Sequence, residues 1–445
     1  MELKSILGYL QNKTILVTGA TGFLAMVFVE KILRVQPDVK KIYLLLRASD
    51  TNSATDRKYN DIIGKELFRV LKEILGPDFD SFIIEKVVAI PGDVTSENLG
   101  VKEFQLREEM CNEIQIILNF ASTTNFDERY DVALDVNTFG VLNEKLNELK
   151  GQGASEEVIS STMKDFGIER AKFYGWPNTY VFTKAIGEIC LGRSRGNLPV
   201  VIVRPTVVTS TCKEPFPGWI QGFRTIDSVI AGYCRGKVTC IVANPTLVFD
   251  MIPVDMMVNS IISAMVVNAN QSSIVIFHVG SSFRNPLKIC DIHDFVFRHF
   301  TKSPWVDKDG NRVKVAKCTM FKTMATFSMY MNIFFMIPLE GLKFFNKACG
   351  QYFQDVCVNY NRKLTLVMRL AQLYTPYLLF KGISFDDTNS EELQRVASGY
   401  YIDVKEFNFD SITINWEDYI MYTHIPSWPP KTCHEHKIIG RISNQ

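Results

Sequence analysis

The segment VTGATGFLA, residues 17–25, restricts the fold of this chain more than any other feature. It overlaps the end of an apolar run, TILVT (Thr14–Thr18), and leads into a stretch whose apolar residues recur at helical spacing. An apolar strand, a turn with two glycines and a helix in this order form the phosphate-binding unit of dinucleotide-binding domains. The sequence therefore predicts such a domain close to the first residue.

We call residues 19–22 the glycine turn. Gly19 permits the tight turn, and Gly22 lets the backbone approach the pyrophosphate of a dinucleotide. The amino end of the following helix favours phosphate because its first amides point outwards. We therefore expect further cofactor contacts from the turn and the start of the helix, at Thr21, Phe23 and Leu24.

Four more apolar runs predict strands: IYLLL (Ile42–Leu46), KVVAI (Lys86–Ile90), IQIILN (Ile114–Asn119) and VVIVR (Val200–Arg204). They are rich in Ile, Val and Leu and show little alternation, as strands covered on both faces should. Helical patterns lie between them, which is typical of a parallel α/β sheet. The predicted fold class is α/β, a doubly wound parallel sheet of the Rossmann type.

The end of the second predicted strand indicates which nicotinamide cofactor is used. An acidic residue there would bind the ribose of NAD, but the sequence LLLRAS places Arg47 at this point. A guanidinium can pair with the 2′-phosphate of NADP, so NADPH is favoured; the alternative is an exposed strand-end arginine without a ligand. Further cofactor contacts are expected after the third and fourth strands and in the next helix, at Asp93, Val94, Asn119, Ala121 and Asn137.

The segment NTYVFTKA, residues 178–185, carries the predicted catalytic residues Tyr180 and Lys184. Four residues make just over one helical turn, so both side chains share a face. We expect the ammonium of Lys184 to lower the pKa of Tyr180 and to bind the nicotinamide ribose. Tyr180 would then protonate a carbonyl oxygen as hydride arrives. A Tyr and a Lys on a helix are often only structural, but their position between the glycine turn and VVIVRPT favours catalysis.

Composition excludes several classes of protein. The 445 residues are 47% hydrophobic with a formal net charge of +1, so a globular protein without a strong attraction to nucleic acid is expected. The ten cysteines include no CxxC pair, so we expect free thiols and no metal site. The amino-terminal residues have neither a signal nor a transit-peptide pattern. The expected location is the cytoplasm or the cytoplasmic face of the endoplasmic reticulum.

The second half begins with a polar stretch, Thr301–Lys314, and an apolar segment, Met320–Leu339. The apolar segment is about long enough to span a bilayer. Three interpretations stay open for it, namely a membrane span, docking on a membrane surface and a buried helix. An oligomer is also left open.

Several segments resemble the plant alcohol-forming fatty acyl-CoA reductases: TGATGFLA, VFVEKILRVQP, TTNFDERYDVAL, WPNTYVFTKA, EPFPGWI, DMIPVDMMVN and RLAQLYTPYLLFKG. The resemblance covers nearly the whole chain. It implies an extended short-chain dehydrogenase domain (residues 1–300), a linker and apolar helical segment (301–345), and a mainly helical carboxy-terminal reductase domain (346–445). It also implies that NADPH reduces long-chain acyl-CoA, through an aldehyde, to a primary alcohol; the acyl substrate rests on the resemblance alone.

The chain departs from that family between Asn137 and Tyr180. Relatives carry a strand there whose Ser bonds the substrate carbonyl. Here Asn143 is followed by a polar stretch without an apolar β-branched run, which predicts no central strand. Ser155, Ser160 and Ser161 are the hydroxyls available, and none is a convincing replacement. A second departure is Met26, where relatives have Lys, which is expected to remove a cation near the phosphates.

Three functions remain at this point. The first is an acyl-CoA reductase, impaired by the missing strand. The second is an inactive relative that binds cofactor or acyl chain and partners active subunits. The third is an NADP-dependent sugar-nucleotide dehydratase or epimerase, which shares the glycine turn and the YxxxK spacing but does not account for the helical carboxy-terminal region.

Overall fold

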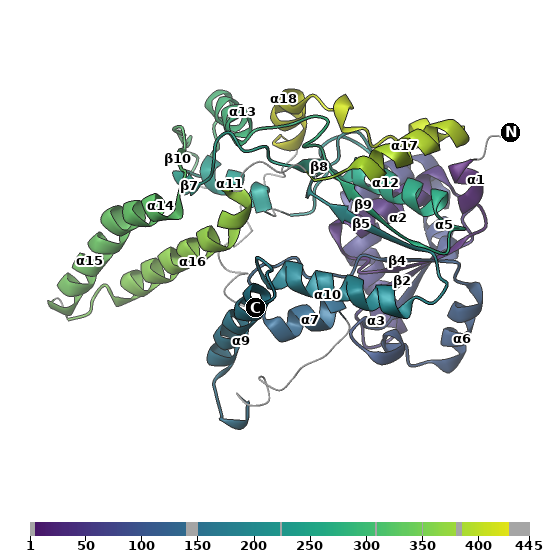
Figure 1. Ribbon diagram of the computed structural model, residues 1–445, viewed down its shortest axis with the longest axis horizontal. Helices are drawn as coiled ribbons and strands as arrows, with labels where there is room; N and C mark the ends of the chain where they lie inside the picture. Colours follow the sequence, from purple (N-terminus) through teal and green to yellow (C-terminus); the bar gives the residue numbers. More distant parts are fainter. Residues whose placement is uncertain are drawn as a thin grey trace. The chain divides into compact units, whose positions relative to one another are not determined.

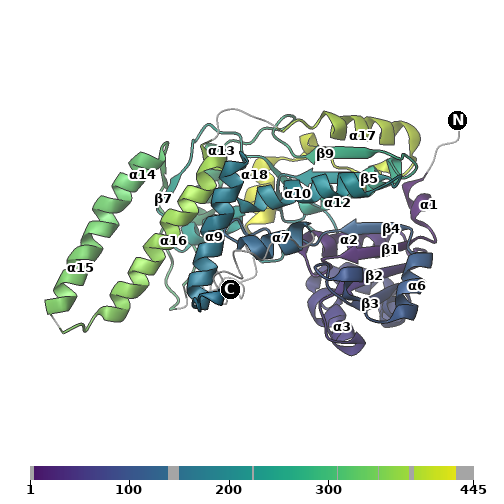
Figure 2. The same ribbon diagram turned by 60° about the horizontal axis from the view of Figure 1, so that its bottom comes forward.

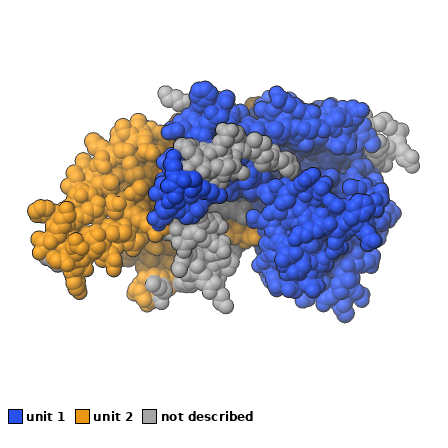
Figure 3. Space-filling view, turned by 90° about the horizontal axis from the view of Figure 1, so that it is seen from below, with its two compact units in different colours: residues 1–219, 252–279, 386–410 blue, residues 220–251, 280–385, 411–445 orange. Residues whose placement is uncertain are grey.

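The computed structural model describes residues 5–138, 150–222, 225–307, 309–348, 350–379 and 385–426. The chain forms two compact units, and both draw on separate parts of the sequence (Figure 3). Unit 1 comprises residues 1–219, 252–279 and 386–410, and unit 2 the residues between and after them. The domain limits inferred from the resemblance, at residues 300 and 345, stay a prediction.

The main sheet of unit 1 has four parallel strands in the order β3-β2-β1-β4. The strands are β1 (Thr14–Thr18), β2 (Lys41–Leu46), β3 (Val87–Pro91) and β4 (Ile116–Asn119). All four were predicted as strands, within two residues at each end. β1 is buried along its whole length because neighbours cover both its faces and both its edges. The parallel α/β class is thereby confirmed.

The fifth predicted strand, β5 (Val200–Pro205), does not join this sheet. It pairs in parallel with β9 (Ile274–Val279) in a separate two-stranded sheet (Figure 2). A third pair joins β6 (Val207–Thr209) to β8 (Met251–Pro253). Among the described residues, β4 pairs only with β1 and β5 only with β9, so the parallel sheet is interrupted between β4 and β5. The two strands therefore do not pair directly with each other within the described residues.

Two buried helices connect the separated sheets. α2 (Phe23–Val35) follows the glycine turn, and α12 (Val254–Val267) packs against both α2 and β5. Nearly every residue of α12 is buried, polar ones included. Because residues on every side of α12 are buried, other elements must enclose this helix. The core of unit 1 therefore runs through the helix layer where the sheet is interrupted.

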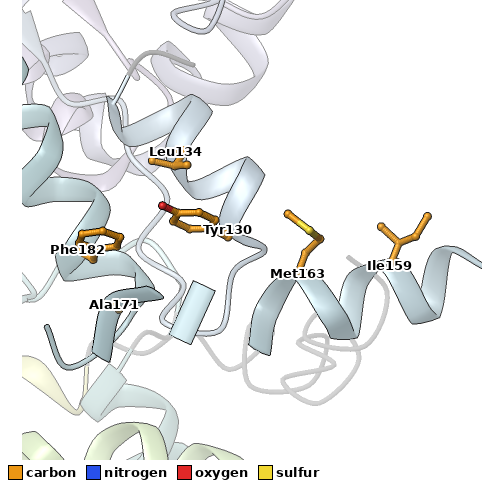
Figure 4. Close-up of a cluster of buried hydrophobic side chains, with 6 residues drawn as sticks. All are labelled: Tyr130, Leu134, Ile159, Met163, Ala171 and Phe182. Carbon is orange, nitrogen blue, oxygen red and sulfur yellow. The ribbon is translucent and has the colours of Figure 1, made fainter. Parts of the chain in front are cut away.

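α7 (Tyr130–Thr138), α9 (Glu156–Phe173) and α10 (Thr179–Ser194) form a second core of unit 1. Side chains from all three helices meet in one cluster, which Figure 4 shows: Tyr130, Leu134, Ile159, Met163, Ala171 and Phe182. α9 occupies the polar stretch in which no strand was predicted, and the structure confirms a helix there. α9 packs against α10 and α7, and it does not supply the strand that the family has between β4 and β5.

The remaining helices of unit 1 are α1 (Ile6–Leu10), α3 (Thr51–Arg57), α4 (Arg69–Leu75), α5 (Phe79–Lys86), α6 (Phe104–Glu113) and α17 (Thr388–Tyr400). Shorter turns are η1 (Lys58–Ile63), η2 (Glu66–Phe68), η3 (Gly76–Asp78), η4 (Glu97–Gly100) and η6 (Val404–Phe407). α17 packs on α12 and β9, so a segment far along the chain completes the first unit (Figure 1).

Unit 2 is mainly helical, as the sequence predicts for the second half. Its elements are α11 (Thr225–Cys234), β7 (Cys240–Val242), α13 (Ile289–Lys302), β10 (Thr319–Phe321), α14 (Met324–Met331), η5 (Asn332–Met336), α15 (Ile337–Ala348), α16 (Gln354–Leu378), η7 (Ser411–Thr413), α18 (Trp416–Asp418) and η8 (Tyr419–His424). β7 and β10 pair in parallel.

The apolar segment Met320–Leu339 is not one helix. It comprises the end of β10, then α14, η5 and the start of α15. Phe327, Met331 and Leu339 from this segment are buried together with Leu364 of α16. None of the described helices combines the length and the apolar character needed to cross a membrane.

Candidate active site

The glycine turn has the backbone geometry that its sequence predicts. Gly19 has a φ of +63°, and a Cβ there would lie 2.6 Å from the backbone nitrogen of Ala121. Only glycine avoids both the strained torsion and this clash. The Gly22 amide donates to the Gly19 carbonyl at 2.8 Å, and Gly22 is the N-cap of α2. The first amides of α2 lack partners within the helix and so suit an anionic ligand.

Asn119 fastens the loop after β4 to the end of β1. Its Oδ1 accepts a hydrogen bond from the Thr18 hydroxyl at 2.6 Å and from the Ala121 amide at 3.2 Å. The structure thus brings Gly19, Asn119 and Ala121 together at the carboxyl ends of adjacent parallel strands. Ligands of doubly wound sheets bind at this edge.

A loop that sequence reasoning did not single out as functional packs against the same turn. Residues 211–219 follow β6, and Trp219 stacks on Phe23 with 5.4 Å between ring centroids. Asp255 of α12 accepts hydrogen bonds from the amides of Cys212, Lys213 and Glu214 at 2.7–3.0 Å. Three amides on one buried carboxylate hold this loop in a single conformation.

Glu214 attaches the loop to α2 a second time. Its carboxylate pairs with Lys31 at 2.5 Å and with Arg34 at 2.8 Å. Arg34 also pairs with the buried Glu30 at 2.8 Å. The motif EPFPGWI contained this loop, but no periodicity in the sequence relates Glu214 to Lys31. Only the folded chain shows the pairing.

The predicted 2′-phosphate residue, Arg47, lies just after β2 and is exposed. Its carbonyl accepts a hydrogen bond from Arg57 Nη1 at 2.7 Å. A second guanidinium that the sequence did not suggest therefore lies at the same strand end. Arg57 also pairs with Asp61 at 2.9 Å, on an exposed surface.

The side chains of Asp93 and Val94, after β3, make contacts within the protein. Asp93 Oδ1 accepts from both the amide and the hydroxyl of Thr95 at 2.9 Å, which forms a local turn. Val94 packs against a buried cluster that includes Leu16 and Ile90. Their role at the adenine stays a prediction.

Two further predictions have different outcomes. Asn137 falls within α7, but its side chain lies outside the described part of the chain. Met26 is fully buried in the core. The expectation that position 26 lies beside the phosphates is therefore wrong, because its side chain faces into the core of unit 1. A lysine there would have to be buried.

Tyr180 and Lys184 lie one turn apart on α10. Asn178 begins this helix, its side chain accepting from the Val181 amide at 3.0 Å. Tyr180 stacks on Phe126 with 5.4 Å between ring centroids. The loop after β4 therefore touches both parts of the candidate site, since Ala121 lies against Gly19 and Phe126 against Tyr180.

Burial controls the titration of the pair. It raises the pKa of Tyr180 above 10.0 and lowers the pKa of Lys184 below 10.5. Glu188, one turn further on, partly offsets the second shift. The expectation that Lys184 lowers the pKa of Tyr180 is wrong for the free protein, because desolvation outweighs any effect of the ammonium.

Glu188 also connects α10 to β5. Arg204, at the end of β5, forms a two-pronged ion pair with Glu188, one bond of which measures 3.0 Å. Arg204 Nη1 lies 3.2 Å from His278 Nε2 on β9. The helix with Tyr180 and Lys184 is thus fixed to the two-stranded sheet.

The three serines considered as replacements belong to α9 and not to a strand. Ser155 is the N-cap of α9, and its hydroxyl accepts from the Val158 amide at 3.4 Å. Ser160 and Ser161 lie within α9. One face of β4 is exposed within the described part of the chain, since the side chain of Ile117 is 67% exposed. A strand covered on both faces would bury this residue.

A family model described as "Male sterility protein", for an NAD-binding domain, matches residues 17–149 and 142–261. The two matches meet at residues 142–149. This is where the polar stretch replaces the expected strand.

Relatives match over almost the full chain. The "Alcohol-forming fatty acyl-CoA reductase" of Simmondsia chinensis is 44% identical, with 96% of this chain and 98% of that protein covered. The "Probable fatty acyl-CoA reductase 4" of Arabidopsis thaliana is 46% identical, with 94% and 97% covered. The alignment with the first runs over 484 positions, more than the 445 residues of this chain, so that relative carries positions that are missing here.

Among solved structures, the reductase domain of a nonribosomal peptide synthetase from Mycobacterium tuberculosis superimposes with a TM-score of 0.52. The match covers 88% of this chain and 86% of that domain at 12% identity. At this identity the likeness concerns the fold alone, and it agrees with the Rossmann-type assignment.

Proposed function

The chain belongs to the fatty acyl-CoA reductase family, and on that basis we propose that it uses NADPH to reduce long-chain fatty acyl-CoA to the primary alcohol. The observation that carries the proposal is the loop after β4, which joins the glycine turn to Tyr180 through Ala121 and Phe126. A nicotinamide dinucleotide on the turn would supply hydride. The residues present suit it, because Gly22 is the N-cap of α2 and the amino end of a helix favours phosphate.

The proposed reaction has two reductive steps. In the first, hydride adds to the thioester carbonyl, the carbon–sulfur bond breaks and the CoA thiol leaves, which gives the aldehyde. In the second, hydride adds to the aldehyde and its oxygen takes a proton. Each step consumes one NADPH, and two protons are taken up in total.

Tyr180 is the proposed proton donor. Because burial raises its pKa above 10.0, the phenol stays protonated at neutral pH and can donate to the carbonyl oxygen. Lys184 lies one turn away, so its ammonium can hold the nicotinamide ribose and favour the phenolate formed by proton transfer. Phe126 fixes the plane of the Tyr180 ring.

Preference for NADPH over NADH is proposed from the cationic end of β2. Arg47 is exposed there, the Arg57 guanidinium bonds its backbone carbonyl, and a 2′-phosphate can pair with such arginines. The test is binding of both dinucleotides to the wild type and to Arg47→Ala. Weaker NADPH binding with unchanged NADH binding supports the role, whereas an equal loss for both dinucleotides refutes it.

The interrupted sheet favours a second candidate, a relative with little or no turnover that retains cofactor or acyl binding. In the family, the hydroxyl that orients the carbonyl belongs to a strand that the described residues do not form between β4 and β5. Loss of one such donor costs roughly 10²–10³-fold in turnover. A sugar-nucleotide dehydratase or epimerase finds no support in any relative reported above.

The deciding experiment is incubation of the purified chain with NADPH and long-chain acyl-CoA, followed by quantification of fatty alcohol. Alcohol formation that Tyr180→Phe abolishes supports the reductase. NADPH binding without any product from either protein supports the non-catalytic relative. Turnover of nucleotide sugars would contradict both. Chain-length preference, oligomeric state and a location in the cytoplasm or at the endoplasmic reticulum stay predictions.

A further inference from the structure

We infer that the helical hairpin of unit 2 docks on the surface of an anionic phospholipid bilayer. The hairpin consists of α14, η5 and α15 running antiparallel to α16 (Figure 1). The turn that joins α15 to α16 lies at its far end from β7 and β10, and we call this turn the tip. The inference goes beyond the proposed function because it does not depend on the reaction.

α15 has three distinct faces. One is buried against the rest of unit 2, at Leu339 and Asn346. A second is charged and carries Glu340, Lys343 and Lys347, with Lys343 paired to Glu340 at 2.7 Å. The third combines exposure with apolar character, at Ile337, Gly341, Phe344, Phe345 and Ala348. These five positions fall within about 100° on a helix of 3.6 residues per turn.

The aromatic side chains concentrate towards the tip. Phe344 is 79% exposed, Phe345 55% and Tyr352 83%. Isolated exposed apolar residues are common on proteins, but a continuous helix face with two adjacent phenylalanines marks an interaction surface. Aromatic rings with a lysine beside them, here Lys347, are typical of helices that lie in a membrane interface.

The charge distribution identifies the partner. From Met324 to Leu378 the chain has five basic residues and two acidic ones, a net charge of +3. The whole chain has a net charge of +1, so the rest has −2. Basic residues close to a bilayer are attracted by anionic headgroups, and the exposed rings beside them can enter the interface. An uncharged protein partner would not account for this excess.

Docking requires that the hairpin lies on the bilayer. None of the described helices is long and apolar enough to cross a membrane. The buried face of α15 is already occupied by α16, so its exposed apolar face is the one that can enter the lipid (Figure 2). This arrangement suits shallow insertion of Phe344 and Phe345 with the backbone held at headgroup level.

The test is sedimentation of the full chain with vesicles, without NADPH or acyl-CoA. One set of vesicles is pure phosphatidylcholine and the other contains phosphatidylserine as well. We expect the wild type to bind the anionic set and lose that binding at high salt. Phe344→Ser combined with Phe345→Ser should bind at least about tenfold more weakly. Lys347→Gln combined with Lys363→Gln should reduce the preference for phosphatidylserine.

The matched control is Phe104→Ser on α6, which removes an equally accessible ring (63% exposed) from another surface and should not change binding. Thermal denaturation of each variant shows that it is folded. Equal binding by the wild type and the double phenylalanine variant would overturn the inference, as would no binding by the wild type. A dimer that the double variant dissociates, without vesicle binding, would instead make this face a contact between two copies. Because no substrate is present, none of these outcomes bears on the proposed reduction.

Discussion

Trp219 lies against Phe23 at the first residue of α2, with 5.4 Å between ring centroids and 30° between ring planes. One ring comes from the loop after β6 and the other from α2, directly after the glycine turn. The contact therefore holds the start of α2 against a loop fixed by Asp255. The amides at the start of α2 are the proposed hydrogen-bond donors to the cofactor phosphates.

Replacing Trp219 by Ala should weaken dinucleotide binding. An aromatic pair of this kind contributes about 0.5–1.5 kcal/mol, so the Kd for NADPH should rise roughly threefold to tenfold. Fluorescence titration measures this change. Trp219→Phe should recover most of the affinity, and Trp305→Ala in unit 2 serves as the control. An unchanged Kd in Trp219→Ala would show that the stack has no part in cofactor binding.

Replacing Gly19 by Ala should remove dinucleotide binding and destabilise the chain. The new Cβ would lie 2.6 Å from Ala121 N at a φ of +63°, so the backbone of two strand ends must move. We expect a loss of at least about 2 kcal/mol in the free energy of unfolding. The control is Gly341→Ala in α15, where a Cβ meets nothing within 4 Å. This variant should gain up to about 1 kcal/mol, since alanine suits a helix better. Denaturant titration compares the two.

Turnover should fall at alkaline pH through Lys184 and not through Tyr180. Burial lowers the pKa of Lys184 below 10.5 and raises that of Tyr180 above 10.0. The downward shift favours loss of the Lys184 proton as the limiting event, and the upward shift keeps Tyr180 a competent acid to a higher pH than a solvent-exposed phenol. Lys184→Arg should move the alkaline limb of the pH–rate profile upwards, because a guanidinium stays charged. If the limb does not move in that variant, a different group sets it.

Glu30 should make the chain less stable at neutral than at acidic pH. Burial raises its pKa from 4.5 to about 7. Between these values the folded chain binds more protons than the unfolded chain, so the free energy of unfolding falls as pH rises. Relative to Glu30→Gln, the wild type should lose up to about 3 kcal/mol across this window. Denaturant titration of both proteins at pH 4.5 and at pH 7 measures this loss, and Glu66→Gln, in an exposed pair with Arg69, serves as the control variant.

Insertion of the family's Ser-bearing strand between α7 and α9 should restore a continuous sheet. We expect a higher melting temperature and turnover raised by roughly 10²–10³-fold. The matched control carries the same strand with Ala in place of its Ser. That control should gain stability but not turnover. If the unmodified chain already turns over as fast as the restored one, the argument from the missing strand is wrong.

The sequence was sufficient for the first sheet, because buried parallel strands have apolar runs that need no knowledge of their partners. Thr14–Thr18 was predicted without error, and Val87–Pro91 lies one residue from its predicted bounds. The absence of a strand after Asn143 was equally legible, since polar residues cannot occupy a central strand. The separation of β4 from β5 follows from this absence. The pairing of β5 with β9 could not be predicted from the sequence.

The supports of the candidate site were not predictable in the same way. Glu214 pairs with Lys31, and Asp255 binds the amides of Cys212 and Lys213, although these partners lie far apart in sequence. Such contacts leave no periodic pattern. The pKa of Tyr180 was predicted in the wrong direction because burial is a property of the packed helix, whereas the spacing to Lys184 is visible in the sequence.

The interruption between β4 and β5 should make the chain prone to mispairing with other polypeptides in a cell. Within the described residues β4 pairs with β1 alone and β5 with β9 alone, so one edge of each has no strand partner. Edges of this kind are templates for any extended polypeptide, including a newly made copy of the same chain. The yield of native protein should therefore decrease as expression rises, and chaperones that occupy bare strand edges should restore it.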